Sequence, residues 1–480
     1  MSLSRCFALS SLVLPLVIGS ASGLMLDAVR PTVAWAQADS EADRLLNEGF
    51  ELYRISEWQQ ALDAWQQALE LYRQTNNRNG EAKTLGNIGI IYRSLGDYPQ
   101  ALDYYEQSLA LTRELGDRAT EANALGNIGI IYQLLANYPQ ALDYQEQSLA
   151  LTRELGDRAT EANTLGNIGI IYHLSGDYPQ ALDYQEQSLA LTRELGDRAG
   201  EANTLGNIGI IYRLLGDYPQ ALDYYEQSLA LTRELGNRDT EAKTLGNIGI
   251  IYDLLGDYPQ ALDYYEQSLV LTRELRNRAT EAKTLGNIGI VYQLLGDYPQ
   301  ALEYQEQSLV LKRELGDRAG EAKALGNIGI IYDLLGDYPQ ALDYQEQSLA
   351  LTRELGDRAG EAKTLGNIGI IYEKLGDYPQ ALDYYEQSLA LKRELGNRAG
   401  EANTLGNIGY LFEAQSEPQL AIIFFKEAVN IHEEFRERHQ SFEQANQATF
   451  TATVEDTYRK LADLLLQQDR ILEAQRVLDF

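Results

Sequence analysis

Apolar residues recur along most of this chain at the spacing of one helical face. In the segment EAKTLGNIGIIYRSLGDYPQALDYYEQSLALTRELGDRAT (81–120), they lie three or four positions apart, with polar residues between them. The pattern predicts a helix from Tyr98 to about Leu115 and another from about Arg118 to Leu135. Each copy of this segment is therefore predicted to form a helix, a tight turn, a second helix and another turn.

The turn between the two predicted helices contains both a stop and a start signal. Gly96 can end the first helix in the left-handed conformation, and Asp97 can cap the second. Gln100 lies three residues after Asp97, as in a capping box. Pro99 falls in the first turn of the second helix, where its missing N–H costs no hydrogen bond. These signals favour a short connection between antiparallel helices.

The forty-residue segment returns without insertion along the chain. Its copies begin at positions 121, 161, 201, 241, 281, 321 and 361, and residues 41–80 and 401–440 are weaker copies in the same register. A fixed period between about 20 and 50 residues indicates a solenoid, in which stacked neighbours bury a core that no single unit can bury. Residues 37–440 are accordingly predicted to form one array of ten repeats.

These residues resemble the tetratricopeptide repeat, whose pattern is W-x2-L-G-x2-Y…A-x3-F. The matching positions are Leu85, Ile88, Gly89, Tyr92, Ala101 and Tyr105, with small Ser108 near the end. The weaker copies match through Gly49, Ala61, Trp65 and Ala68 and through Gly409, Ala421, Phe425 and Ala428. The resemblance implies an all-α solenoid with a right-handed superhelical twist and a concave groove lined by the first helices. The period is six residues longer than the common one, as in kinesin light chains and related spindle-orientation adaptors.

Two glycines in each predicted first helix need an explanation, because a glycine inside a helix costs about 0.5–1 kcal/mol relative to alanine. We expect Gly89 to face Ala101 of the partner helix, so that the two backbones approach closely. Gly86 lies one turn earlier and is expected to pack against the preceding repeat. Both glycines are therefore interpreted as structural.

One asparagine per repeat forms a row along the expected groove. The row consists of Asn87, Asn127, Asn167, Asn207, Asn247, Asn287, Asn327, Asn367 and Asn407. The resemblance implies that these amides grip the backbone of an extended peptide, since an amide offers both donors and an acceptor. The alternative is that each asparagine bonds a neighbouring helix and stitches the array together. The sequence leaves both hypotheses open.

Two positions vary among otherwise nearly identical repeats, and both are predicted on the groove face. The first row reads Arg93, Gln133, His173, Arg213, Asp253, Gln293, Asp333 and Glu373. The second reads Lys83, Asn123, Asn163, Asn203, Lys243, Lys283, Lys323 and Lys363. Such rows could select the side chains of an extended ligand, or they could record drift at tolerant exposed sites.

A third variable position replaces the aromatic residue at Tyr105 by glutamine in some repeats. These repeats carry Gln145, Gln185, Gln305 and Gln345. A buried glutamine needs hydrogen-bond partners, so we expect these repeats to be locally softer.

Composition narrows the function further. The formal charge is −31, which repels phosphates and argues against nucleic acid or an anionic membrane as the partner. The single cysteine is Cys6, and the histidines are His173, His432 and His439, so no metal-ligand cluster or nucleophile–base pair is expected. We therefore expect no cofactor, no metal and no enzymatic activity.

Residues 1–36 differ from the rest of the chain. Arg5 precedes an apolar run from Cys6 to Leu26, and Ala34–Ala36 offers an A-x-A cleavage site. The segment predicts a signal peptide and an exported protein, with cleavage after Ala36 or after Ala21. The alternative is an uncleaved leader that anchors the protein in a membrane.

Residues 441–480 are interpreted as a linker followed by a truncated helix pair. This ending resembles the segment that joins a repeat array to a caspase-like protease domain in cyanobacterial CHAT proteins. The sequence therefore predicts a non-enzymatic protein-interaction scaffold that binds an extended polypeptide in its groove. The alternative is a regulatory or sensor module of a CHAT-type protease system, with a separate protease as the possible partner.

Overall fold

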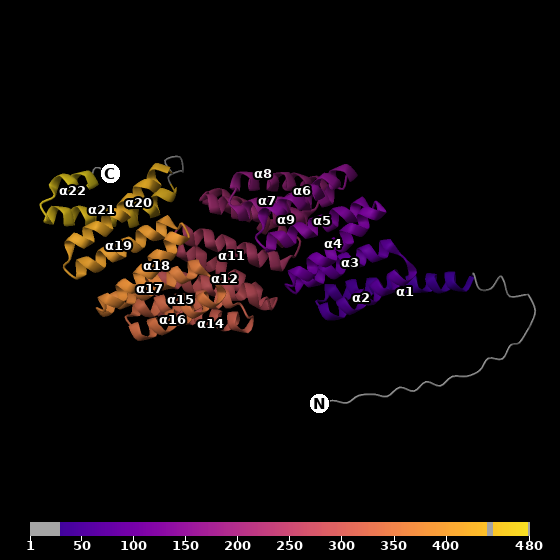
Figure 1. The fold of residues 1–480 in the computed structure, drawn as a ribbon, viewed down its shortest axis with the longest axis horizontal. Coiled ribbons are helices and arrows are strands. Elements are labelled where there is room, and N and C mark those ends of the chain that lie inside the picture. Colours follow the sequence, from indigo (N-terminus) through magenta and orange to yellow (C-terminus); the bar gives the residue numbers. More distant parts are fainter. Residues whose placement is uncertain (1–28, 439–444, 479–480) are drawn as a thin grey trace, which may run out of the picture. The chain divides into compact units, whose positions relative to one another are not determined.

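The computed structural model describes residues 29–438 and 445–478, with side chains described from 37 to 434 and from 455 to 478. Most of the predicted signal peptide and the start of the predicted linker lie outside the described residues. The described part of the chain is an all-α solenoid of helix pairs (Figure 1). Helix α1 already begins at Val29, before the predicted cleavage site at Ala36, and α21 begins at Ala445 inside the predicted linker.

Each repeat contributes two helices. The first helices are α1 (Val29–Arg54), α3 (Arg78–Ser94), α5 (Arg118–Leu134), α7 (Arg158–Ser175), α9 (Arg198–Leu215), α11 (Arg238–Leu254), α13 (Arg278–Leu294), α15 (Arg318–Leu335), α17 (Arg358–Leu375), α19 (Arg398–Ala414) and α21 (Ala445–Gln467). The second helices are α2 (Trp58–Thr75), α4 (Tyr98–Leu115), α6 (Tyr138–Leu155), α8 (Tyr178–Leu195), α10 (Tyr218–Glu234), α12 (Tyr258–Glu274), α14 (Tyr298–Glu314), α16 (Tyr338–Leu355), α18 (Tyr378–Glu394), α20 (Pro418–Arg438) and α22 (Ile471–Leu478).

The chain divides into two compact units, residues 1–171 (unit 1) and residues 172–480 (unit 2). Within unit 1, successive helices from α1 to α6 pack against each other, and α3 also contacts α5. Within unit 2, successive helices from α8 to α22 pack in the same way, and first helices two elements apart touch. These contacts connect helices of the same repeat or of adjacent repeats, which is the arrangement of a solenoid.

The predicted turn signals are present at the expected positions. Gly96 has a φ of 79°, a conformation that glycine adopts without the steric cost of a Cβ. The Asp97 carboxylate accepts a hydrogen bond from the backbone N–H of Gln100 at 3.2 Å, and Pro99 lies in the first turn of α4. The turn therefore forms as predicted from these local residues.

The apolar core runs from one repeat into the next. Tyr105 and Leu109 of α4 pack against Leu125 and Ile128 of α5, the first helix of the following repeat. Because this core combines residues of two neighbouring repeats, a single repeat could not bury its apolar face alone. The core also leaves the opposite face of the first helices, which carries the asparagine row, free of core packing.

Ion pairs join consecutive repeats along one edge. Glu321, at the start of α15, accepts from Arg313 of α14 at 2.8 Å and from Arg318 at 3.0 Å. Arg318 also pairs with Glu354 of α16 at 2.9 Å, and the pattern recurs in other repeats. The buried glutamate thus ties the end of one repeat to the start of the next.

Candidate functional site

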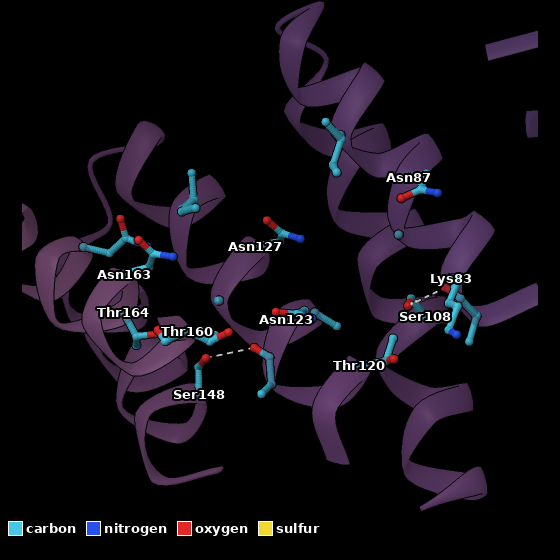
Figure 2. A pocket seen from close by; sticks show the side chains of 18 of the residues that line it. Lys83, Asn87, Ser108, Thr120, Asn123, Asn127, Ser148, Thr160, Asn163 and Thr164 are labelled. Atoms are coloured by element: carbon cyan, nitrogen blue, oxygen red, sulfur yellow. Dashed lines mark hydrogen bonds between the residues drawn. The ribbon is translucent and has the colours of Figure 1, made fainter. Parts of the chain in front are cut away.

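The asparagine row lines a cavity in unit 1. The cavity has a volume of about 520 Å³ and lies across α3, α5 and α7. Its polar lining includes Lys83, Asn87, Asn123, Asn127, Asn163 and Asn167. Figure 2 shows Asn87, Asn127 and Asn163 projecting from separate helices into this open region. Three successive repeats therefore present equivalent polar side chains to one space.

Small residues form the floor of this cavity. Gly86 lines it, and a Cβ added to Gly86 would meet only the Ser108 Oγ, at 3.7 Å. Ser108 itself donates to the backbone carbonyl of Ala82 at 2.8 Å (Figure 2). The prediction that Gly86 packs against the preceding repeat is wrong, since its neighbour is the second helix of its own repeat. The missing Cβ instead deepens the floor of the groove.

The second glycine has a different role. A Cβ added to Gly89 would lie 2.6 Å from the ring of Tyr105, and no real side chain fits at that distance. The nearest atoms therefore belong to Tyr105 rather than to Ala101, and the predicted partner was wrong. The structural interpretation of Gly89 holds, because the glycine makes room for a buried aromatic ring.

Among the residues whose side chains the structure describes, no asparagine of the row forms a hydrogen bond with another helix, and each is half-buried. Stitching of the array by these amides would require such bonds. Amide groups that line a cavity without a protein partner have donors and acceptors available for a ligand.

Unit 2 contains equivalent cavities. One of about 550 Å³ is lined by Lys323, Asn327, Lys363 and Asn367. A second, of about 340 Å³, is lined by Lys363, Asn367 and Asn407. The asparagine and lysine rows therefore lie beside each other in both units.

The lysine row is exposed and mostly unpaired. Lys243 pairs with Asp239 on its own helix at 2.6 Å. Among the described residues, Lys283, Lys323 and Lys363 have no carboxylate within ion-pair distance. Lys283 has an exposed side chain, but partial desolvation of its amine, together with the nearby Arg213, lowers its pKa. This row therefore places several amines along unit 2, although the whole chain is strongly acidic and Asp357 also lines the 550 Å³ cavity.

Members of the other variable row contact neighbouring helices, and their predicted place in the groove stays a prediction. Glu373 accepts a hydrogen bond from the Tyr385 hydroxyl at 2.7 Å, and burial raises the pKa of Glu373. Asp333 pairs with Lys374 at 2.7 Å. Burial raises the pKa of Asp253. None of these three acids lines the cavities described above.

This row is coupled to the alternation between tyrosine and glutamine at the buried position. The charged residues Arg93, Arg213, Asp253 and Glu373 occur in repeats with a tyrosine there. Burial raises the pKa of Tyr105 and of Tyr225 to about 12, and Arg93 and Arg213 oppose these rises. Repeats with glutamine carry a neutral residue or His173, except for Asp333, which pairs with Lys374 instead. Part of the variation in the row that begins with Arg93 is therefore associated with whether a tyrosine or a glutamine is buried in the same repeat.

The buried glutamines are only partly satisfied. Gln145 donates to the carbonyl of Gly126 at 2.9 Å, and Gln305 donates to that of Gly286 at 2.8 Å. Their carbonyl oxygens have no hydrogen-bond partner in the described residues. In the described residues the hydroxyl of Tyr105 at the same position also has no partner, so the softening of the glutamine repeats stays a prediction.

Two groove residues were missed by the sequence reasoning. Lys312 of α14 and Lys392 of α18 replace a buried threonine, and each amine reaches the glycine of its own groove floor. The signal was visible in the sequence, where LKREL replaces LTREL in two repeats. The position was overlooked because it belongs to a second helix, whereas only first helices were expected to line the groove.

Two general searches of the described residues were negative. They contain no group of three histidine, cysteine, aspartate or glutamate side chains placed to hold a metal ion. Within the same residues, no helix combines the length and apolar character needed to span a bilayer.

Comparisons with known proteins agree with the fold. Solved structures of similar fold include aspartyl phosphate phosphatase F from Bacillus subtilis, at 13% identity and a TM-score of 0.51, covering 78% of this chain and 96% of that one. The apo quorum sensor NprR from B. thuringiensis matches at 18% identity and a TM-score of 0.50, covering 76% and 99%. A signal transduction ATPase with a tetratricopeptide repeat sensor from Pyrococcus horikoshii matches at 16% identity and a TM-score of 0.52, covering 66% and 48%.

At these identities the likeness concerns the fold alone. A search of curated proteins finds no match. The family described as Tetratricopeptide repeat matches residues 41–114, 120–194, 200–274, 280–354 and 360–434. These matches cover most of the chain and coincide with successive pairs of repeats, so the chain belongs to the tetratricopeptide-repeat family of protein-interaction scaffolds.

Proposed function

We propose that this protein is a non-enzymatic scaffold that binds an extended polypeptide in the groove formed by its first helices. The observation that carries the proposal is the row of asparagine amides that line the cavities and make no hydrogen bond with another helix in the described residues. An extended backbone presents N–H and C=O groups at regular intervals, and side-chain amides can pair with both. The glycine floor lets that backbone approach closely.

The comparisons are compatible with this function. A Rap protein of similar fold, at 17% identity and a TM-score of 0.50, was solved in complex with competence and sporulation factor. A solenoid of this kind can therefore hold a ligand. The identity of the ligand here must come from binding experiments.

The test is a selection from a random-peptide display library on the intact chain. We expect recovered peptides to bind the wild-type protein and to lose at least tenfold in affinity when Asn87, Asn127 and Asn167, which line one cavity, are replaced together by alanine, because several hydrogen bonds of about 1 kcal/mol each disappear. Fluorescence anisotropy measures the affinity, and circular dichroism checks that the helices persist.

A matched control removes three amides from second helices of the same repeats, by replacing Gln107, Gln147 and Gln187 with alanine. These side chains do not line the cavity, so the control should bind like wild type. Equal losses of peptide affinity in both triple variants, or unfolding of the asparagine variant, would contradict peptide binding in the groove.

Two further hypotheses come from the sequence. We propose that the protein is exported, with cleavage after Ala36 or Ala21. N-terminal sequencing of the protein from fractionated cells tests this, and an intact leader in the membrane fraction would favour anchoring.

The resemblance of residues 441–480 to CHAT proteins supports a second candidate partner, a separate caspase-like protease. Co-purification of such a protease with the intact chain would favour that regulatory role.

A further inference from the structure

Lys392 departs from a pattern that most repeats share. The equivalent position is a buried threonine in six of the repeats, namely Thr112, Thr152, Thr192, Thr232, Thr272 and Thr352. Thr352 donates to the carbonyl of Leu349 on its own helix at 3.0 Å. A lysine cannot make this local bond, so its replacement of threonine removes a satisfied buried hydroxyl and introduces a cation.

The Lys392 amine extends from α18 to the groove floor. It donates to the Thr404 Oγ1 at 2.6 Å and lies 3.8 Å from the point where a Cβ of Gly366 would be. Lys392 lines the 340 Å³ cavity together with Lys363, Asn367 and Asn407. Two amines and two amides, from three helices, thus face one space.

In the described part of the chain, no acid forms an ion pair with either of these amines. The residues lining the cavity include no aspartate or glutamate, and the described residues contain no ion pair of Lys363 or Lys392. Asn397 lines this cavity at the position where the preceding repeat has Asp357. Burial lowers the pKa of Lys392, with no contribution from a nearby charge.

A similar but weaker arrangement occurs two repeats earlier. Lys312 of α14 reaches within 3.7 Å of the Cβ position of Gly286. Burial lowers the pKa of Lys312, nearby Asp317 raises it and Lys323 lowers it. Because Asp317 already offers a partial counter-charge, this position is a weaker anion site than the one around Lys392.

We propose that Lys392 and Lys363 form a subsite for the carboxylate of an acidic side chain in the bound polypeptide. The proposal rests on the proposed function and adds the class of ligand: an extended segment with an acidic residue at this cavity and a second one two repeats away, near Lys312. A carboxylate accepts hydrogen bonds from both ammonium groups and from neighbouring amides, which supplies the missing counter-charge. The acidic surface elsewhere would repel such a segment and so confine it to this groove.

The test uses fluorescein-labelled decaglutamate, with a neutral Gly-Ser decapeptide and decalysine for comparison, on the full chain at low salt. We expect decaglutamate to bind in the groove and the K392T variant to bind it about tenfold more weakly, through loss of one charge-assisted bond. Threonine is the residue of six other repeats, so this variant should fold. Decaglutamate should also protect the Lys392 amine from an acylating reagent, as read by peptide mass mapping.

Two more variants sharpen the result. K243N removes a groove lysine that Asp239 already neutralises, so its effect should be less than threefold. T352K places a lysine at the same position in the repeat that lies between those of Lys312 and Lys392. It should strengthen decaglutamate binding. A K392T protein that binds decaglutamate as tightly as wild type, or an unprotected Lys392, overturns the subsite.

The two proposals fail in distinguishable ways. If library-selected peptides bind and depend on the asparagine row, but neither decaglutamate binding nor the selected sequences depend on Lys392, the acidic subsite is wrong and the groove stands. If neither decaglutamate nor any selected peptide depends on the asparagine row, the groove function itself fails.

Discussion

At the scale of single residues, the two glycines of the LGNIG motif have separate purposes. Gly209 of α9 lies against the ring of Tyr225, where a Cβ would come within 2.7 Å of the ring. Gly206 has only the Ser228 Oγ nearby, at 3.8 Å from the Cβ position. Gly209 is needed by the core, whereas among the described residues no close neighbour requires a glycine at Gly206. Its cost in helix propensity is therefore best explained by the shape of the groove.

This difference predicts opposite effects of one substitution at two positions of the same helix. Gly209→Ala should lower the free energy of unfolding by about 1–3 kcal/mol, because the ring must shift in a packed core. Gly206→Ala should raise it by about 0.5–1 kcal/mol, because alanine favours the helix and meets no close atom. Urea midpoints followed by circular dichroism measure both. Destabilisation of similar size in the two variants would show that Gly206 is also a packing residue.

At the scale of helices and turns, the sequence was sufficient for most of what the structure shows. The bounds of α4 and α5 agree with the prediction to within a residue, because capping residues and glycines act locally. The neighbours of Gly89 could not be predicted in the same way. They depend on how two helices are rotated about their axes, which local spacing does not determine.

Glu401 gives a prediction about the contacts between repeats. It lies at the start of α19 and accepts from Arg393 of α18 at 2.8 Å and from Arg398 at 2.7 Å. Burial raises the pKa of Glu401, but the hydrogen bonds from Arg393 and Arg398 outweigh it and leave the pKa below its ordinary value. Glu401→Gln should therefore lower the free energy of unfolding at neutral pH by about 1–3 kcal/mol.

The sign of the pH dependence follows from the lowered pKa. The unfolded chain binds the proton more tightly than the folded one. The contribution of Glu401 to the free energy of unfolding is therefore complete above its ordinary pKa and is lost as the pH falls through its pKa in the folded protein. The difference between wild type and Glu401→Gln should thus shrink in acid. Urea titrations from neutral to acidic pH measure it, and a gap that stays constant or widens in acid would contradict the ion-pair contribution.

At the scale of the whole molecule, the sequence located the asparagine row but not everything that surrounds it. A row with a forty-residue period must fall on one face if equivalent helices stack, and three of its members do line one cavity in unit 1. Lys312 and Lys392 enter the groove from second helices, through space left by glycines. Such an approach depends on three-dimensional proximity, so periodicity along the first helices gave no indication of it.

Stacking of equivalent repeats predicts that a deletion is tolerated only in whole repeats. Removing residues 241–280 joins Thr240 to Glu281, so that α13 packs on α10 through nearly the same residues that α11 uses now. Removing residues 261–280 instead deletes most of α12, brings two first helices together and takes away the Tyr265 ring that fills the space beside Gly249. Nearest-neighbour contacts determine stability in a solenoid. The longer deletion should therefore keep the ellipticity per residue and a midpoint close to wild type, while the shorter one should lower both. If the shorter deletion proved the less harmful, successive repeats would not be stabilised by equivalent interfaces.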